Sequence, residues 1–218
     1  MSSRKTRTDV VKPTGRVATG TVNVGDKVSV SRSGETATVD RLILGKTNFN
    51  HVTAGQSITM TLDREIDISR GDVVGHNDVI WKQADHFDVE LIWMSKKKGF
   101  TGREYRLKLS TQESKARITR IKSILDVQTL TSLAATELNC NDVASVQMAI
   151  TRPLTFSKYD NNRELGSFIL IDDFSNETIG AGLISNDLRR SSNVRKYHLG
   201  INKAIRQASN GHIGKVIW

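Results

Sequence analysis

Short runs of β-branched and alternating apolar residues fill the chain from Val17 to about Ile184, and glycine, asparagine or aspartate ends each run within a few residues. This pattern is typical of an all-β barrel or sandwich, and it leaves no room for a long amphipathic helix. We predict strands in the clearest runs. They are Lys27 to Arg32, Thr36 to Ile43, Gln56 to Leu62, Phe87 to Met94, Tyr105 to Leu109, Ala116 to Ile124, Val143 to Ile150 and Phe168 to Ile171.

Tight turns separate several of these runs. Val24-Gly25-Asp26 and Ser33-Gly34-Glu35 have the composition of hairpin reversals. Gly45-Lys46-Thr47 has the ending of a phosphate-binding P-loop, but that motif needs a glycine five residues earlier, where the chain has Asp40. A carboxylate at that position repels phosphate. We therefore predict a hairpin turn at Gly45 instead of a nucleotide site.

The spacing of the runs predicts two domains. A looser stretch at His76-Asn77-Asp78 precedes the Phe87 run, which places a boundary between about 76 and 86. We predict a flexible basic leader over 1–14, a first β-barrel over 15–80 and a second over 81–186. Residues 187–218 form a tail with a helix of apolar period 3.6, followed by a strand-like run that ends at Trp218.

The formal net charge of +9 raises the possibility of nucleic-acid binding. The excess lies at the ends, because residues 1–16 hold five Lys or Arg against Asp9 and residues 187–218 hold seven against Asp187. The body between is close to neutral, so we expect solvated basic termini, and Lys96-Lys97-Lys98 beside Phe100 is predicted to be a solvated loop. An RNA- or tRNA-binding module stays open as an alternative.

Residues that would carry chemistry are scattered. The five histidines have no metal-ligand spacing, no nucleophile elbow is present, and Cys140 stands alone and is predicted to be a core residue. We predict no catalytic, cofactor-binding or metal-binding residue in this chain. The N-terminus lacks an apolar signal region and no run is long enough for a membrane span, so we expect a soluble, cytoplasmic protein.

One segment resembles a known family. Thr59-Met60-Thr61-Leu62 followed by Glu65-Ile66-Asp67-Ile68-Ser69-Arg70-Gly71-Asp72 is similar to the second domain of the GTPase subunit of bacterial sulfate adenylyltransferase, the large subunit of ATP sulfurylase. Further along, Trp93-Met94 and Gly166-Ser167-Phe168 are similar to its third domain. The family-motif residues are expected to be structural or to lie at an interface. They are Glu65, Ile66, Asp67, Ile68, Ser69, Arg70, Gly71, Asp72, Trp93, Met94, Gly166, Ser167 and Phe168.

The resemblance implies a mainly β fold of two consecutive translation-factor-type barrels, like those of elongation factor Tu, with a short helical C-terminal tail. It implies a non-catalytic barrel portion that couples GTP hydrolysis to adenylylsulfate synthesis in sulfate assimilation. GTP, ATP and Mg are implied only for other parts: a missing GTPase domain before residue 15 and the catalytic adenylyltransferase subunit. A stand-alone scaffold is a further alternative.

The tail adds a second resemblance. Asn202-Lys203-Ala204 and Lys215-Val216-Ile217-Trp218 are similar to the lead-in to an adenylylsulfate kinase in fused bifunctional enzymes, so a missing C-terminal kinase domain is an expected partner. Within the motif, Arg70 lies between Asp67 and Asp72, and we expect a local ion pair there that adds little stability if it is exposed.

Overall fold

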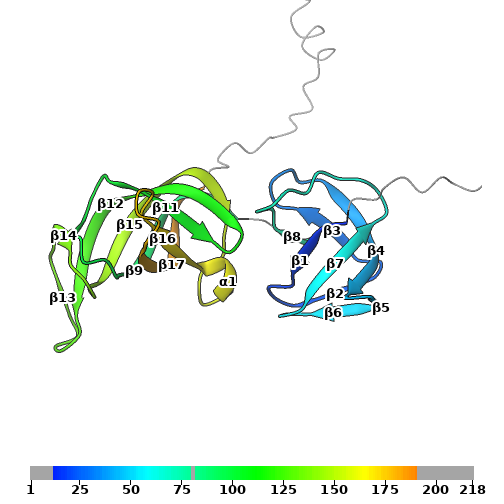
Figure 1. Ribbon diagram of the computed structural model, residues 1–218, viewed down its shortest axis with the longest axis horizontal. Helices are drawn as coiled ribbons and strands as arrows, with labels where there is room; N and C mark the ends of the chain where they lie inside the picture. The colour runs from blue at the N-terminus through cyan, green and yellow to red at the C-terminus, as the bar shows by residue number, and fades with distance from the viewer. Residues whose placement is uncertain (1–11, 80–81, 191–218) are drawn as a thin grey trace, which may run out of the picture.

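The computed structural model describes residues 12–79 and 82–190, which form two groups of β-strands joined by a short connection (Figure 1). The mainly β prediction is confirmed, since the described residues hold one four-residue helix, α1 at Arg163–Gly166, and are otherwise strands and turns. No helix among them is long and apolar enough to cross a membrane. The predicted basic leader, apart from 12–14, and the helix within the predicted tail lie outside the described residues.

The first group is an antiparallel sheet with strand order β1-β7-β4-β3-β8, in which β5 also pairs with β4, and a separate pair of β2 and β6. Alternate residues of the longer strands point inward and form one core, centred on Val30, Val39 and Leu42. The strands are β1 (Thr14–Arg16), β2 (Thr21–Asn23), β3 (Lys27–Val30), β4 (Thr36–Leu44), β5 (Thr47–Phe49), β6 (His51–Thr53), β7 (Ser57–Leu62) and β8 (Val74–His76).

The turn at Gly45 is a hairpin, as predicted. Leu44 at the end of β4 pairs with Thr47 at the start of β5, so Gly45 and Lys46 make the reversal. Gly45 has a φ of +63°, a conformation that costs a residue with a Cβ more than it costs glycine. No helix follows the triplet, which is incompatible with the strand-loop-helix context of a P-loop.

The second group closes into a barrel. Its strands pair in the order β11-β16-β17-β9-β15-β12, and β12 pairs back with β11, while β13 extends the sheet beyond β12. The elements are β9 (Gln83–Trp93), β10 (Gly99–Phe100), β11 (Glu104–Leu109), β12 (Gln112–Asp126), β13 (Thr131–Leu133), β14 (Glu137–Leu138), β15 (Val143–Thr155), β16 (Ser167–Ile171) and β17 (Thr178–Arg190), with α1 before β16.

The barrel interior is filled by large side chains from every strand of the closed circuit, among them Phe87, Trp93, Tyr105 and Met148. Rings meet edge to face: the Phe87 and Phe156 centroids lie 4.9 Å apart, and those of Trp93 and Tyr105 lie 5.7 Å apart. β17 continues to Arg190, so the first residues of the predicted tail, 187–190, belong to a strand.

The two groups touch at several points. The side chain of Gln83, at the start of β9, donates from Nε2 to the carbonyl oxygen of Ser31 at 2.8 Å. Arg16 on β1 forms an ion pair with Glu164 on α1, with Nη1 3.4 Å from Oε1. Gln83 begins the first strand after the connection, and Ser31 directly precedes Arg32, which binds the loop described below.

Candidate functional site

The segment from Asp63 to Val73 joins β7 to β8 and contains the whole predicted motif Glu65–Asp72. We call this segment the motif loop. It has no regular secondary structure, yet Ile66 is buried and Ile68 is half-buried, and both pack on the core of the first group. These two apolar anchors hold the loop against the sheet, while Asp67, Ser69 and Arg70 beside them are exposed.

Backbone bonds fix the beginning of the loop to β4. The N–H of Asp63 donates to the carbonyl oxygen of Thr38 at 2.9 Å, and the N–H of Thr38 donates to Asp63 Oδ1 at 2.8 Å. That second bond lowers the pKa of the Asp63 carboxyl below its ordinary value. Arg64 donates from Nε to the carbonyl oxygen of Thr36 at 2.7 Å and from Nη2 to the same oxygen.

Asp72 fixes the end of the loop. Its side chain is only 6% exposed. Arg32, in the turn between β3 and β4, donates to both of its carboxylate oxygens. Arg32 Nε lies 3.0 Å from Oδ1 and Nη2 lies 3.2 Å from Oδ2. The N–H of Ser69 donates to Oδ2 at 2.8 Å. Such two-pronged binding is the geometry that arginine and carboxylate favour.

The expected ion pair of Arg70 is not the one that forms. Arg70 is exposed and has no polar partner among the described residues, whereas Arg32 lies 3.7 Å from Asp67 and binds Asp72 directly. The prediction failed because it considered only neighbours in sequence. The loop turns at Gly71 and brings Asp72 back onto β3, so the matching cation comes from 40 residues earlier. The one signal in the sequence that could have indicated Arg32 is its position in the predicted hairpin turn around Ser33-Gly34-Glu35, which the motif loop could approach.

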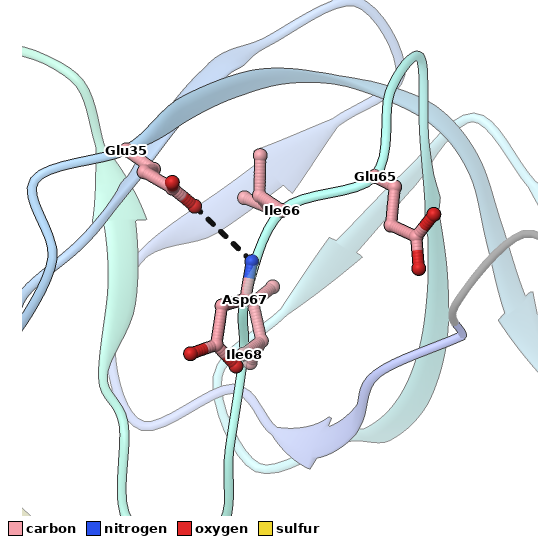
Figure 2. Close-up of a pocket in the computed structure, with 5 residues that line it drawn as sticks. All are labelled: Glu35, Glu65, Ile66, Asp67 and Ile68. Carbon is pink, nitrogen blue, oxygen red and sulfur yellow. Dashed lines mark hydrogen bonds between the residues drawn. The ribbon is translucent and has the colours of Figure 1, made fainter.

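A shallow pocket of about 390 Å³ lies along the middle of the motif loop. It is lined by Glu35, Glu65, Ile66, Asp67 and Ile68. Figure 2 shows the Glu35 carboxylate directed at the backbone N–H of Asp67, which donates to Oε2 at 3.1 Å, while Glu65 turns away from it. Glu35 was not expected at the site; it holds the loop against the β3–β4 hairpin.

The turn of the motif loop meets the second barrel. Gly71 has a φ of +98°, and a Cβ built on it would lie 3.5 Å from the carbonyl oxygen of Thr111, in the turn between β11 and β12. The next residue, Gln112, is buried and bonds to Thr155 in both directions, donating to its carbonyl oxygen at 2.8 Å and accepting from its N–H at 2.9 Å. The motif loop therefore rests on a braced part of the second barrel.

The remaining motif residues lie within the second barrel, apart from the motif loop. Trp93 is buried at the end of β9 and donates from Nε1 to the carbonyl oxygen of Lys97 at 2.8 Å, whereas Met94 is exposed. Gly166 ends α1, where a Cβ would lie 2.4 Å from the Cα of Tyr159. Ser167 Oγ donates to the carbonyl oxygen of Arg163 at 2.7 Å, and Phe168 is buried.

The prediction for Cys140 is wrong, because this residue is exposed. It lies in the turn that joins β14 to β15, where Asn141 has a φ of +71° and Asp142 accepts the N–H of Asn139 at 2.6 Å. Turn residues face solvent because their backbone needs polar partners. The Lys96-Lys97-Lys98 segment is an exposed loop between β9 and β10, as predicted.

The residues of the motif loop make structural contacts and no catalytic arrangement. Its carboxylates are held by backbone N–H groups and by one arginine, and no nucleophile and base lie together there. Across residues 12–79 and 82–190, no group of three or more His, Cys, Asp or Glu side chains could hold a metal ion. The arrangement can fix two β-domains to each other and present an acidic, partly apolar surface.

Comparison with known proteins finds a matching domain family and several related full-length proteins. The family model for GTP-eEF1A C-terminal domain-like proteins matches residues 86–185. The chain is 39% identical over 205 residues to the bifunctional enzyme CysN/CysC of Xylella fastidiosa, covering 94% of this chain and 33% of that protein. It is 36% identical over 172 residues to sulfate adenylyltransferase subunit 1 of Aliarcobacter butzleri, covering 79% and 37%.

The bifunctional enzyme NodQ of Azospirillum brasilense is 33% identical over 204 residues, covering 94% of this chain and 33% of that protein. The chain thus spans about a third of the length of these curated relatives. Among solved structures, Sup35 complexed with GDP superposes with a TM-score of 0.73 at 14% identity, over 81% of this chain and 44% of that one. The prediction of translation-factor-type barrels is therefore confirmed.

Proposed function

The chain belongs to the family that contains sulfate adenylyltransferase subunit 1 and the bifunctional CysN/CysC and NodQ proteins, and we propose that it serves as the non-catalytic two-barrel part of such a subunit. In this role it couples GTP hydrolysis in a GTPase domain to adenylylsulfate synthesis by a catalytic adenylyltransferase subunit, within sulfate assimilation. GTP, ATP and Mg bind outside this chain, and a kinase domain is a further partner in the bifunctional form.

The observation that carries the proposal is the attachment of the motif loop to both barrels. Arg32 and Glu35 hold it on the first barrel, and Gly71 rests against Thr111 on the second. A domain that couples two partners has to pass a movement of one partner on to the other. Packed elements whose loops are held by hydrogen bonds do this better than mobile linkers. The residues of the motif loop are thus assigned a structural role at the junction of the barrels.

The test is a segment exchange in the Xylella fastidiosa relative. Its matching segment is replaced by this chain, and adenylylsulfate formation is measured with the catalytic subunit, with and without GTP. We expect GTP to stimulate synthesis in the exchanged protein, and the isolated 218-residue chain to show neither GTP binding nor adenylylsulfate synthesis. Synthesis that no longer responds to GTP, in an exchanged protein that still hydrolyses it, would contradict the coupling role.

A further inference from the structure

Three neighbouring strands of the second barrel present one compact outer surface. β15 pairs with β12 along one edge and with β9 along the other, so strand register sets their outward residues in rows. We call this surface the three-strand face. Neighbouring strands lie about 5 Å apart and successive rows about 7 Å apart. The rows, each read from β12 through β15 to β9, are Arg120, Gln147 and Asp88; Ser123, Ser145 and Glu90; and Leu125, Val143 and Ile92.

The last of these rows is apolar and accessible. Its neighbours on β9, Leu91 and Trp93, are buried, so strand alternation turns Ile92 to the outside, where it is 47% exposed. Leu125 at the other end of the row is also exposed, and Val143 is half-buried between them. Three aliphatic side chains therefore lie side by side on adjacent strands and face away from the core.

The β12–β13 hairpin continues the apolar surface beyond Leu125. We call residues 127–130 the hairpin tip, which exposes Val127 at 68% and Leu130 at 75%. The carbonyl oxygen of Asp126 accepts the N–H of Leu130 at 2.7 Å and fixes the turn. In Figure 1 the hairpin projects on the side of the second barrel away from the first barrel. A preformed tip loses little conformational freedom when it is covered.

The free charges of the face lie on its two outer strands. Arg120 on β12 and Glu90 on β9 are both exposed, and neither has a polar partner in residues 12–79 and 82–190. The charges between them are paired, since Lys122 Nζ lies 2.5 Å from Asp88 Oδ1 and Gln147 Nε2 donates to the same oxygen at 3.3 Å. One edge therefore carries a free cation and the other a free anion.

The remaining charged groups nearby form the rim. Arg117 on β12 lies one row beyond Arg120, about 20 Å from the apolar row, and is opposite Glu104 on β11. His86 occupies the same row on β9, with its Nδ1 3.1 Å from Asp85 Oδ1. Solvent screens charges at such a margin, so the free pair nearer the apolar row has the larger effect on what the face can bind.

This distribution makes the face complementary to itself. Half a turn about an axis along β15 exchanges β9 and β12 and keeps the rows in order, as in an isologous dimer. Leu125 of one copy then faces Ile92 of the second copy, and Val143 faces its own counterpart. Arg120 of one copy lies one row from Glu90 of the second copy, a separation that an arginine and a glutamate side chain span together. Each of these contacts occurs twice.

The apolar ends of the face match in the same arrangement. Met94 follows Ile92 on β9 by two residues and is 51% exposed, so it continues the apolar row at the β9 edge as the hairpin tip does at the β12 edge. The rotation brings the hairpin tip of one copy next to Met94 of the second copy. Apolar surface thus meets apolar surface at one end of the face, and opposite free charges meet near the other.

We propose that the three-strand face binds the same face of a second copy of this chain, in a twofold dimer where Arg120 of each copy pairs with Glu90 of the other. A second copy supplies both missing charges and the apolar row from one surface. The dimer goes beyond the proposed function, because it needs neither GTP nor a catalytic subunit. Three strands make a small interface beside the roughly 800 Å² per partner of a standard complex, so the dimer is weak and concentration-dependent.

The test is sedimentation equilibrium of the 218-residue chain over a range of concentrations, with circular dichroism to confirm that each variant folds. We expect a monomer–dimer equilibrium. Arg120→Glu and Glu90→Arg should each weaken it by at least about tenfold, because each sets like charges against each other twice. Lys46→Glu is the matched control: it makes the same charge change at an exposed turn of the first barrel and should alter the dissociation constant by less than about twofold.

Mixing the two reversed variants separates the proposed pair from a general charge effect. In a heterodimer of Arg120→Glu with Glu90→Arg, both contacts again join opposite charges, so an equimolar mixture should dimerise within about threefold of the parent dissociation constant. The apolar row is tested by Ile92→Lys, which should also weaken the dimer by at least about tenfold. Phe49→Lys, at a similarly exposed apolar residue on β5 of the first barrel, should leave it unchanged.

Three results would overturn the dimer proposal. One is a parent chain that stays monomeric at every concentration, since the face would then belong to another protein. The second is a dimer that survives both single charge reversals, and the third is a mixture of the two reversed variants that fails to recover. None of these measurements involves GTP, so GTP-stimulated synthesis in the segment exchange would preserve the proposed function while the dimer is rejected.

Discussion

Replacing Arg32 with alanine tests the attachment of the motif loop most directly. The substitution removes both side-chain donors of Asp72, at 3.0 and 3.2 Å, and leaves a carboxylate that is 6% exposed with the N–H of Ser69 as its remaining recorded donor. Breaking a fully buried pair costs about 3–5 kcal/mol, whereas exposed pairs contribute about 0–1 kcal/mol. Because Arg32 itself is 60% exposed, water can replace part of its role, so we expect a loss of about 1–2 kcal/mol.

The assay is thermal unfolding with hydrogen exchange of the motif loop. If the first barrel unfolds as its own unit, a loss of that size lowers its midpoint by roughly 5–15 °C. Exchange at the backbone N–H groups of 63–73 should become faster in the variant, while exchange in β9 and β15 stays unchanged. The size of the effect should decrease in high salt, because the exposed side of the pair is screened.

The matched control is Arg70→Ala, which removes an exposed arginine from the motif loop itself. Since Arg70 has no polar partner in residues 12–79 and 82–190, its loss should change the free energy of unfolding by less than about 0.5 kcal/mol. Equal effects of the two substitutions, or a larger effect of Arg70→Ala, would refute the reasoning. The double variant Arg32→Ala with Asp72→Asn should lose less than the sum of the two single losses.

Two further predictions concern the second barrel. Gly166→Ala should destabilise it by about 1–3 kcal/mol in urea unfolding, because the new Cβ would lie 2.4 Å from backbone of Tyr159, whereas Gly15→Ala, with open space around it, serves as control and should differ little from the parent. The N–H of Gln128 lowers the pKa of Asp126 below its ordinary value, so the hairpin tip should be stable above that ordinary pKa and lose protection as the pH falls through the folded pKa. Hydrogen exchange of 127–130 against pH measures this, and protection that stays unchanged after the Asp126 carboxyl is protonated would contradict it.

The sequence could predict what local chemistry determines. Alternating runs indicated the longer strands, and glycines such as Gly45 indicated hairpins, since period-two burial and positive φ depend on neighbouring residues. The pairing of Arg32 with Asp72 could not be read locally, because the loop path decides which cation arrives. Cys140 was misplaced for a similar reason: residue type favours burial, but the turn after β14 faces solvent.

The strand β17 (Thr178–Arg190) was not predicted from the sequence. β17 contains Gly180, Gly182 and Asn186, which are poor strand formers, and it forms because β9 and β16 pair with it on either side. Gly182 has a further reason to be glycine, since a Cβ there would lie 2.3 Å from the ring of Phe168. Tertiary pairing thus overrides local propensity at this strand.

The position of β9 in the closed circuit sets the order in which the chain can fold. β9 begins at Gln83, yet its two neighbours are β15, which begins at Val143, and β17, which ends at Arg190. During synthesis β9 therefore emerges with both edges unpaired. About a hundred further residues must be synthesised before β17 is complete and the circuit of strands can close. Such distant pairing slows folding and exposes strand edges to neighbouring chains. The second barrel should accordingly be the slow and aggregation-sensitive step in producing this protein.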